Sequence, residues 1–134
     1  MKHKKFISIA LLIIIADQLT KFFFTDVHKG IINYTTNTGA AFSILKGQNL
    51  LLMILAIAIG ILVIIYYNKY PKHYIPLSFV LGGIIGNLID RIFFGFVRDF
   101  IDFKVWPIFN IADSFNVIGV AILIIILFKT KDLK

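Results

Sequence analysis

The chain has 134 residues, of which 59% are hydrophobic and 16% are charged. Its mean hydropathy of +0.90 indicates a membrane protein, because a soluble domain of this length cannot bury so much apolar surface. Its net charge of +7 comes from 14 Lys and Arg residues against seven Asp and no Glu, and since the cations flank apolar runs rather than alternate with surface aromatics, we do not expect nucleic-acid binding. The absence of Cys excludes disulfides, thiol catalysis and Cys-ligated metals.

Four apolar stretches are each long enough to cross a bilayer as a helix, which takes about 20 residues. They cover residues 6–25, 49–67, 76–94 and 108–128. The sequence therefore predicts an all-α integral membrane protein with four transmembrane helices, forming a single polytopic domain over 1–134. The first stretch has the basic start and apolar core of a signal peptide, but no small-x-small cleavage site follows it, so we expect an uncleaved span.

The distribution of lysines predicts the orientation of these spans. Most of them lie in short stretches at the N-terminus, between the second and third spans, and in the tail: Lys2, Lys4, Lys5, Lys69, Lys72, Lys129, Lys131 and Lys134. Short cytoplasmic stretches of membrane proteins carry such an excess of cations. Both termini are therefore expected in the cytoplasm, and the longer connections, 26–48 and 95–107, on the opposite side.

The first span contains Asp17 and Lys21, which are four residues apart and lie on one face of the helix. A charge near the bilayer centre costs about 2.5 to 3.5 kcal/mol, so each such residue requires an explanation. A mutually neutralising structural pair explains both residues, and the alternative is that they belong to a polar site.

The connection after the first span has a composition unlike that of the spans. Its segment 30–42 is rich in Asn, Thr and Gly, and Ile31, Ile32 and Tyr34 favour strands. This composition predicts a small sheet or an irregular platform at the membrane surface.

The third span holds Asn87, Asp90 and Arg91, whose spacings of three and four residues place them on one face. We expect this face to point into the bundle or a wet cavity and to orient or contact a substrate. Gly82 and Gly86 form a GxxxG motif just before it, and small residues let neighbouring helices approach closely. The glycines are therefore expected to serve packing.

Carboxylates and an amide surround the connection to the fourth span. Asp99 and Asp102 lie among apolar residues, which indicates an interfacial position, and Asn110 and Asp113 share a face where the fourth span begins. Because the run 115–128 is only 14 residues long, the helix must draw Asn110 and Asp113 toward the hydrocarbon boundary in order to span. Asp113 is therefore expected in a poorly solvated place.

Asp99 and Asp113 lie on the same predicted side of the membrane and form a candidate catalytic pair. Two carboxylates held close together share one proton near neutral pH, so one can act as base toward a water while the other donates a hydrogen bond to a carbonyl. Aspartic proteases cleave amides in this way. We expect no metal and no cofactor, because the sequence lacks an HExxH motif and its three histidines lie in flanks or loops.

Two alternatives remain open at this point. Ser43 and Lys46 share the outer side and formally allow a Ser/Lys dyad. A non-enzymatic four-span transporter or assembly subunit would also carry buried charges. A transport path requires polar groups through the whole membrane depth, whereas 7–15 and 120–128 are almost purely apolar. This profile favours a site at one side of the membrane.

Several short motifs, in order along nearly the whole chain, resemble those of the lipoprotein signal peptidase family, also called signal peptidase II. They are residues 17–21 (DQLTK), 37–42 (NTGAAF), 86–91 (GNLIDR) and 109–113 (FNIAD), with Gly95, Val97, Asp99 and Phe100 after the third. Each motif is short, but all of them on four spans form a specific signal.

The resemblance implies an aspartic endopeptidase of the bacterial cytoplasmic membrane. It would act as a monomer among membrane lipids, removing signal peptides from diacylglyceryl-modified prolipoproteins by cutting before the lipid-bearing Cys at the extracytoplasmic face. The catalytic positions implied are Asp99 and Asp113. The substrate-binding positions implied are Asn37, Asn87, Arg91 and Asn110. The supporting positions implied are Asp17, Lys21, Gly39 and Asp90, with Asp90 expected to pair with Arg91 and organise the region around it. The resemblance also implies a small extracytoplasmic β-platform, which fits the segment 30–42.

Overall fold

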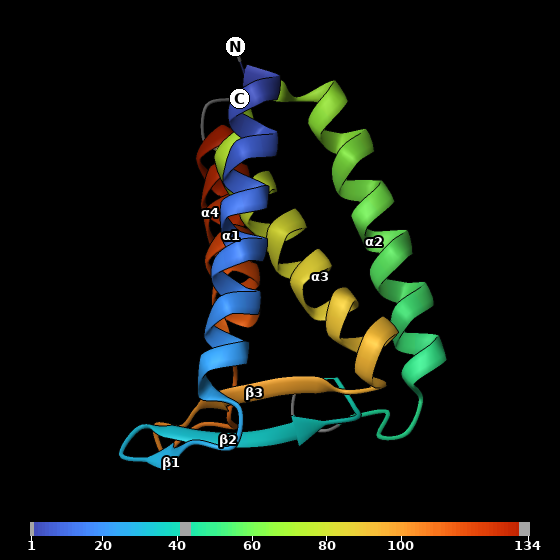
Figure 1. The fold of residues 1–134 in the computed structure, drawn as a ribbon. Helices are drawn as coiled ribbons and strands as arrows, with labels where there is room; N and C mark the ends of the chain where they lie inside the picture. The colour runs from blue at the N-terminus through green and yellow to red at the C-terminus, as the bar shows by residue number, and fades with distance from the viewer. Residues whose placement is uncertain (1, 41–43, 132–134) are drawn as a thin grey trace.

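The computed structural model describes residues 2–40 and 44–131, and its long helices are the four predicted spans (Figure 1). They are α1 Lys2–Phe24, α2 Asn49–Lys69, α3 Tyr74–Phe94 and α4 Ile111–Lys131. Each is long and apolar enough to cross a bilayer, and large apolar side chains remain exposed along all four, as expected of helices that face lipid. The prediction of a mainly helical, multi-pass membrane protein is confirmed.

The helices extend further than predicted on the side of the chain ends. A short 3-10 turn, η2 Pro71–His73, joins α2 to α3, so the connection predicted over 68–75 is largely helical. Pro71 begins this turn, where its fixed φ suits a helical conformation and its missing N–H would have no helical partner. Lys134, one of the tail cations used for orientation, lies outside the described residues.

A three-stranded antiparallel sheet covers one end of the bundle, away from the start of α1 and the end of α4 (Figure 1). Its strands are β1 His28–Lys29, β2 Ile32–Asn37 and β3 Val97–Ile101. A small sheet is thus present where it was predicted, but only β2 lies within the predicted segment 30–42. Strand β1 precedes that segment, and Ala41 and Phe42 lie outside the described residues. Strand β3 was not predicted. It pairs with β2 in a register that places Asp99 opposite Thr35.

Helix α3 lies at the centre and packs against the other three helices. Its glycines allow this: a Cβ on Gly82 would lie 2.9 Å from Ile13 Cβ of α1, and one on Gly86 would lie 2.7 Å from Asp17 Oδ2. The packing role predicted for the GxxxG motif is therefore supported by close approach on the α1 side. At the end of the bundle away from the sheet the core is apolar, and Phe6 stacks on Tyr67 at 3.9 Å between ring centroids.

Candidate active site

A cavity of about 820 Å³ opens where α3 and α4 meet the sheet. Its walls come from β2, β3, α3, α4 and the connection before α4. Six of the predicted site residues line it: Asn37, Gly39, Asn87, Arg91, Asp99 and Asp113. Asn110 is fully buried directly behind this wall and contacts both carboxylates.

The start of α4 fixes Asn110 and Asp113 relative to each other. Asn110 precedes the first residue of the helix, and its Oδ1 accepts a hydrogen bond from the backbone N–H of Asp113 at 2.9 Å. Asp113 Oδ2 accepts one in return from the backbone N–H of Asn110 at 3.3 Å. This reciprocal arrangement is a capping box, which satisfies two amides at the helix N-terminus and locks the geometry of both side chains.

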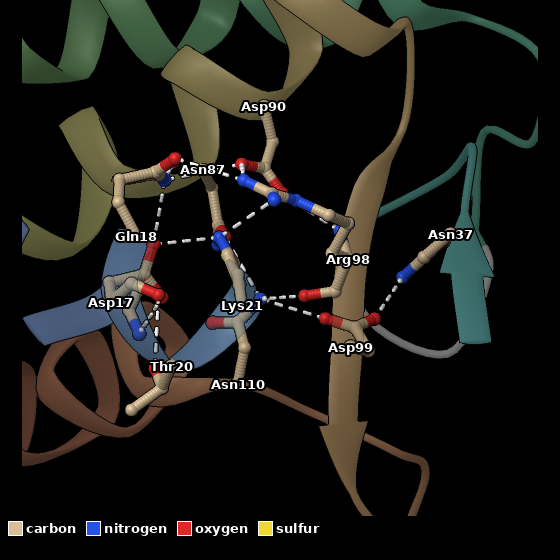
Figure 2. A network of polar contacts seen from close by, with 12 residues as sticks. Asp17, Gln18, Thr20, Lys21, Asn37, Asn87, Asp90, Arg98, Asp99 and Asn110 are labelled. Carbon is tan, nitrogen blue, oxygen red and sulfur yellow. Dashed lines mark hydrogen bonds and ion pairs between the residues drawn. The ribbon is translucent and has the colours of Figure 1, made fainter. Parts of the chain in front are cut away.

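Two asparagine amides join Asp99 to Asp113. Asn110 Nδ2 donates to Asp99 Oδ1 at 2.7 Å and to Asn87 Oδ1 at 3.0 Å. Asn87 Nδ2 in turn donates to Asp113 Oδ1 at 2.7 Å. The second oxygen of Asp99 accepts from Asn37 Nδ2 at 3.3 Å, so Asp99 lies between two amide donors (Figure 2). The sheet and the two helices thereby bring the predicted pair together.

Strand geometry explains why Asp99 faces the cavity while its neighbour does not. Successive side chains of a strand point to opposite faces, and Arg98 accordingly points away from the cavity, toward Asp90 and Gln18. Asp99 is only 2% exposed. Burial, reinforced by the negative charge of Asp113, raises the pKa of Asp99 from 3.8 to about 7, against the opposing hydrogen bonds from Asn37 and Asn110. Near neutral pH this carboxyl is therefore partly protonated.

A second layer of buried charges holds the site from the α1 side. Asp17 Oδ2 lies 2.7 Å from Lys21 Nζ, and both side chains are fully buried. Asp17 Oδ1 accepts from the backbone N–H of Ala112 at 2.9 Å, so it satisfies another amide in the first turn of α4. Lys21 Nζ donates to Asn87 Oδ1 at 3.0 Å. The predicted Asp17–Lys21 pair therefore exists, and it orients residues that touch Asp113.

The expected pairing of Asp90 with Arg91 is wrong. Asp90 binds Arg98 instead: its carboxylate accepts from Arg98 Nη2 at 2.8 Å, from Nε at 3.2 Å and from the backbone N–H at 2.9 Å (Figure 2). It also lies 3.4 Å from Lys21 Nζ. The physical reason is that adjacent residues of a helix point in different directions, so Asp90 and Arg91 do not face each other.

Arg91 faces the cavity rather than the charge network. Its Nη2 donates to the backbone carbonyl of Gly39 at 2.7 Å, which ties α3 to the segment after β2. Its Nη1 is buried and has no hydrogen-bond partner within residues 2–40 and 44–131.

Sequence reasoning missed three residues of this region: Gln18 and Arg98 of the charge network, and Asn116, which lines the cavity. Arg98 is a cation directly beside Asp99 in a largely apolar segment, and this placement could have indicated that it belongs to the site. Of the alternative Ser/Lys dyad, Ser43 lies outside the described residues and Lys46 is exposed.

Comparison with known proteins identifies the family of the chain. The family model described as signal peptidase (SPase) II matches residues 9–129. The chain is similar to the lipoprotein signal peptidase of Halothermothrix orenii, with 40% identity over 92% of this chain and 94% of that protein. It is also 45% identical to the lipoprotein signal peptidase of Caldanaerobacter subterraneus, over 69% of this chain and 66% of that protein.

Solved structures show the same fold. One, described as a bacterial membrane enzyme determined by the in meso method at 2.3 Å, superposes with a TM-score of 0.90 at 34% identity, over 98% of this chain and 92% of that one. A second, determined by the same method at 1.9 Å, gives a TM-score of 0.83, also at 34% identity, over 94% of each chain.

Proposed function

The chain belongs to the signal peptidase II family of membrane proteases, and from that premise we propose that it is an aspartic endopeptidase that removes signal peptides from diacylglyceryl-modified prolipoproteins. The observation that carries the proposal is the pair Asp99 and Asp113, joined through Asn110 and Asn87 at the wall of a large cavity. The cut falls immediately before the lipid-bearing Cys. The enzyme acts as a single-domain monomer in the cytoplasmic membrane, with this cavity at the extracytoplasmic face.

The chemistry follows from one proton shared by two carboxyl groups. The ionised carboxylate takes a proton from a water whose oxygen attacks the scissile carbonyl carbon, while the protonated carboxyl donates a hydrogen bond to the carbonyl oxygen. The tetrahedral intermediate then collapses: the C–N bond breaks, and the leaving nitrogen takes the proton that the first carboxylate accepted. The products are a signal peptide with a new carboxyl group and a lipoprotein with a new amino terminus at its Cys.

The remaining cavity residues hold the substrate. Asn37, the last residue of β2, donates to Asp99, and Arg91 reaches Gly39 just after this strand from α3. Arg91 Nη1 has no hydrogen-bond partner within residues 2–40 and 44–131, and it can donate to a backbone carbonyl of the extended signal peptide. Apolar side chains such as Phe103 and Val117 line the same cavity and suit the lipid-modified part of the precursor.

The transporter alternative lacks a comparable observation. The buried charges Asp17, Lys21, Asp90 and Arg98 gather at the sheet end, whereas the core at the other end is built from apolar residues such as Phe6 and Leu77. Among the described residues, the buried ion pairs are thus gathered at one end, which suits a site that is open to one side of the membrane.

The proposal is tested with purified protein and a lipid-modified precursor. We expect Asp99→Asn and Asp113→Asn each to abolish cleavage while the protein stays inserted and abundant, because either change removes the shared-proton chemistry and nearly preserves shape. The double variant should be no worse than either single variant, since residues that act as one catalytic unit are strongly non-additive.

Asp102→Asn is the matched control. The Asp102 carboxylate accepts hydrogen bonds from Lys104 and Asn33, and Asp102 does not line the cavity, so substantial activity should remain. Cleavage by Asp99→Asn or Asp113→Asn, together with inactive Asp102→Asn, would show that the wrong carboxylates are paired here.

A further inference from the structure

The cavity continues past the two carboxylates along α4, and one polar side chain lies on that deeper wall. Asn116 lines the cavity together with Val117 and Ile118. It is three residues further into the membrane-spanning helix than Asp113, about 4.5 Å along the axis at 1.5 Å per residue. A side-chain amide at this depth is costly unless it gains a partner.

Within residues 2–40 and 44–131, Asn116 forms no side-chain hydrogen bond, and its Oδ1 is fully buried. The buried part of the amide packs on α3 at Gly83: a Cβ there would lie 2.5 Å from Asn116 Oδ1 and 2.6 Å from its Cγ. Gly83 thus provides the space in which the amide oxygen is held. This leaves Nδ2 as the polar atom on the cavity side.

A substrate of the proposed function requires a donor at this place. A signal peptide must leave the helical conformation near the scissile bond for that bond to reach the carboxylates. Each residue that unwinds at membrane depth exposes a backbone carbonyl without water to hydrogen-bond it, which is unfavourable unless a protein donor replaces the water. In the orientation proposed above, a signal peptide whose N-terminus lies in the cytoplasm would run along α4 toward the sheet, and its last residues before the cut would lie beside Asn116 when the scissile bond is at Asp113.

We infer that Asn116 is a substrate-binding residue whose Nδ2 donates a hydrogen bond to a backbone carbonyl of the unwound signal peptide, on the cytoplasmic side of the scissile bond. The inference rests on the proposed function and adds a position to it. The contact stabilises the bound substrate and the transition state equally, so it lowers the KM and does not change the kcat.

The test compares Asn116→Leu, which keeps the side-chain size but removes the donor, with Asn68→Leu, the same change at an exposed position near the end of α2. For Asn116→Leu we expect the KM for a synthetic lipid-modified precursor to rise roughly five- to tenfold, as one lost hydrogen bond implies, with the kcat within twofold of the wild-type value. Asn68→Leu should change neither constant.

A second measurement separates this inference from the proposed function. In the Asp99→Asn background the affinity for the same precursor is measured directly, and adding Asn116→Leu should raise the Kd by the same factor. Failure of the wild-type protein to cleave would contradict the proposed function, while the Kd would still report on Asn116. Unchanged KM and Kd, or a kcat that falls together with the melting temperature, would overturn the role of Asn116.

Discussion

Asp99 and Asp102 are three residues apart, yet their surroundings act on their charges in opposite directions. Burial and the nearby charge of Asp113 raise the pKa of Asp99 to about 7. Hydrogen bonds, first from Lys104 and then from Asn33, lower the pKa of Asp102 to about 2. The Asp102 carboxylate also accepts the backbone N–H of Lys104 at 2.8 Å, which closes an Asx turn after β3. Asp99 is thus suited to exchange a proton near neutral pH, whereas Asp102 stays ionised and stabilises the turn after β3.

These directions predict opposite effects of two Asp→Asn substitutions on stability. A folded-state pKa of about 7 against 3.8 for the unfolded chain means that the folded protein binds more protons between these values, so stability falls as pH rises through this window. Asp99→Asn removes the free-energy cost of ionising this buried carboxyl group. We therefore expect its melting temperature to exceed the wild-type value increasingly from pH 5 to pH 8, by an amount equivalent to at most about 4 kcal/mol.

Asp102→Asn provides the control for that measurement. Its lowered folded-state pKa contributes stability that is fully present above about pH 4 and is lost as pH falls toward 2. Between pH 5 and 8 this variant should be less stable than the wild-type protein by an amount that does not vary with pH. If the stability difference between Asp99→Asn and the wild-type protein did not vary with pH, ionisation of Asp99 would not destabilise the folded protein, and the account would be contradicted.

At the scale of helices, the close approach of α3 to α1 rests on Gly82. A Cβ at this position would lie 2.9 Å from Ile13 Cβ and 3.0 Å from the backbone oxygen of Ala10, so the helix itself must shift. Gly82→Ala is therefore expected to lower the free energy of unfolding by about 1–3 kcal/mol, as overpacking typically does. Thermal unfolding of the purified protein in detergent measures the effect.

Gly60 of α2 offers the matched substitution. The nearest atom to a Cβ there is Ile84 Cγ2 at 3.9 Å, an ordinary contact. Gly60→Ala should be neutral or stabilise the protein by about 0.5–1 kcal/mol, because alanine loses less backbone entropy in a helix. Equal effects of the two substitutions would contradict the account of helix packing.

The helices of this protein could be predicted from the sequence, whereas one of its strands could not. The spans follow from hydropathy alone, because a helix in lipid satisfies its own backbone hydrogen bonds and needs only an apolar exterior. Strand β3 was missed because its partner β2 lies about 60 residues earlier in the chain, and strand pairing between distant segments leaves no local periodicity. The meeting of Asp99 with Asp113 depends on that pairing, so it could be suspected from topology but not demonstrated.

Side-chain pairing was predicted correctly where it is local and wrongly where it is not. Asp17 and Lys21 are four residues apart on one helix, and they form the expected ion pair. Asp90 was matched to its sequence neighbour Arg91, but it binds Arg98, which a turn and a strand bring back over the end of α3. Asn116 was overlooked because a single amide hardly changes the hydropathy of a long apolar run.

For the whole molecule, polarity is distributed along one axis. The sheet lies at one end of the bundle, while the start of α1 and the end of α4 lie at the other (Figure 1). The cavity and the buried charges lie at the sheet end. Lysines concentrate near the end away from the sheet, as Lys4, Lys5 and Lys69 illustrate, which favours its placement in the cytoplasm. Such an arrangement suits a protease that meets its substrates at the outer boundary of the membrane.

The most direct test of the central claim is the mass of the products formed from a lipid-modified precursor by the purified wild-type protein. We predict two products, a free signal peptide and a lipoprotein that begins with the lipid-bearing Cys, and neither of them with Asp99→Asn. A precursor that lacks the diacylglyceryl group should remain intact. No cleavage of the modified precursor, or cleavage at a bond other than the one before its Cys, would contradict the account.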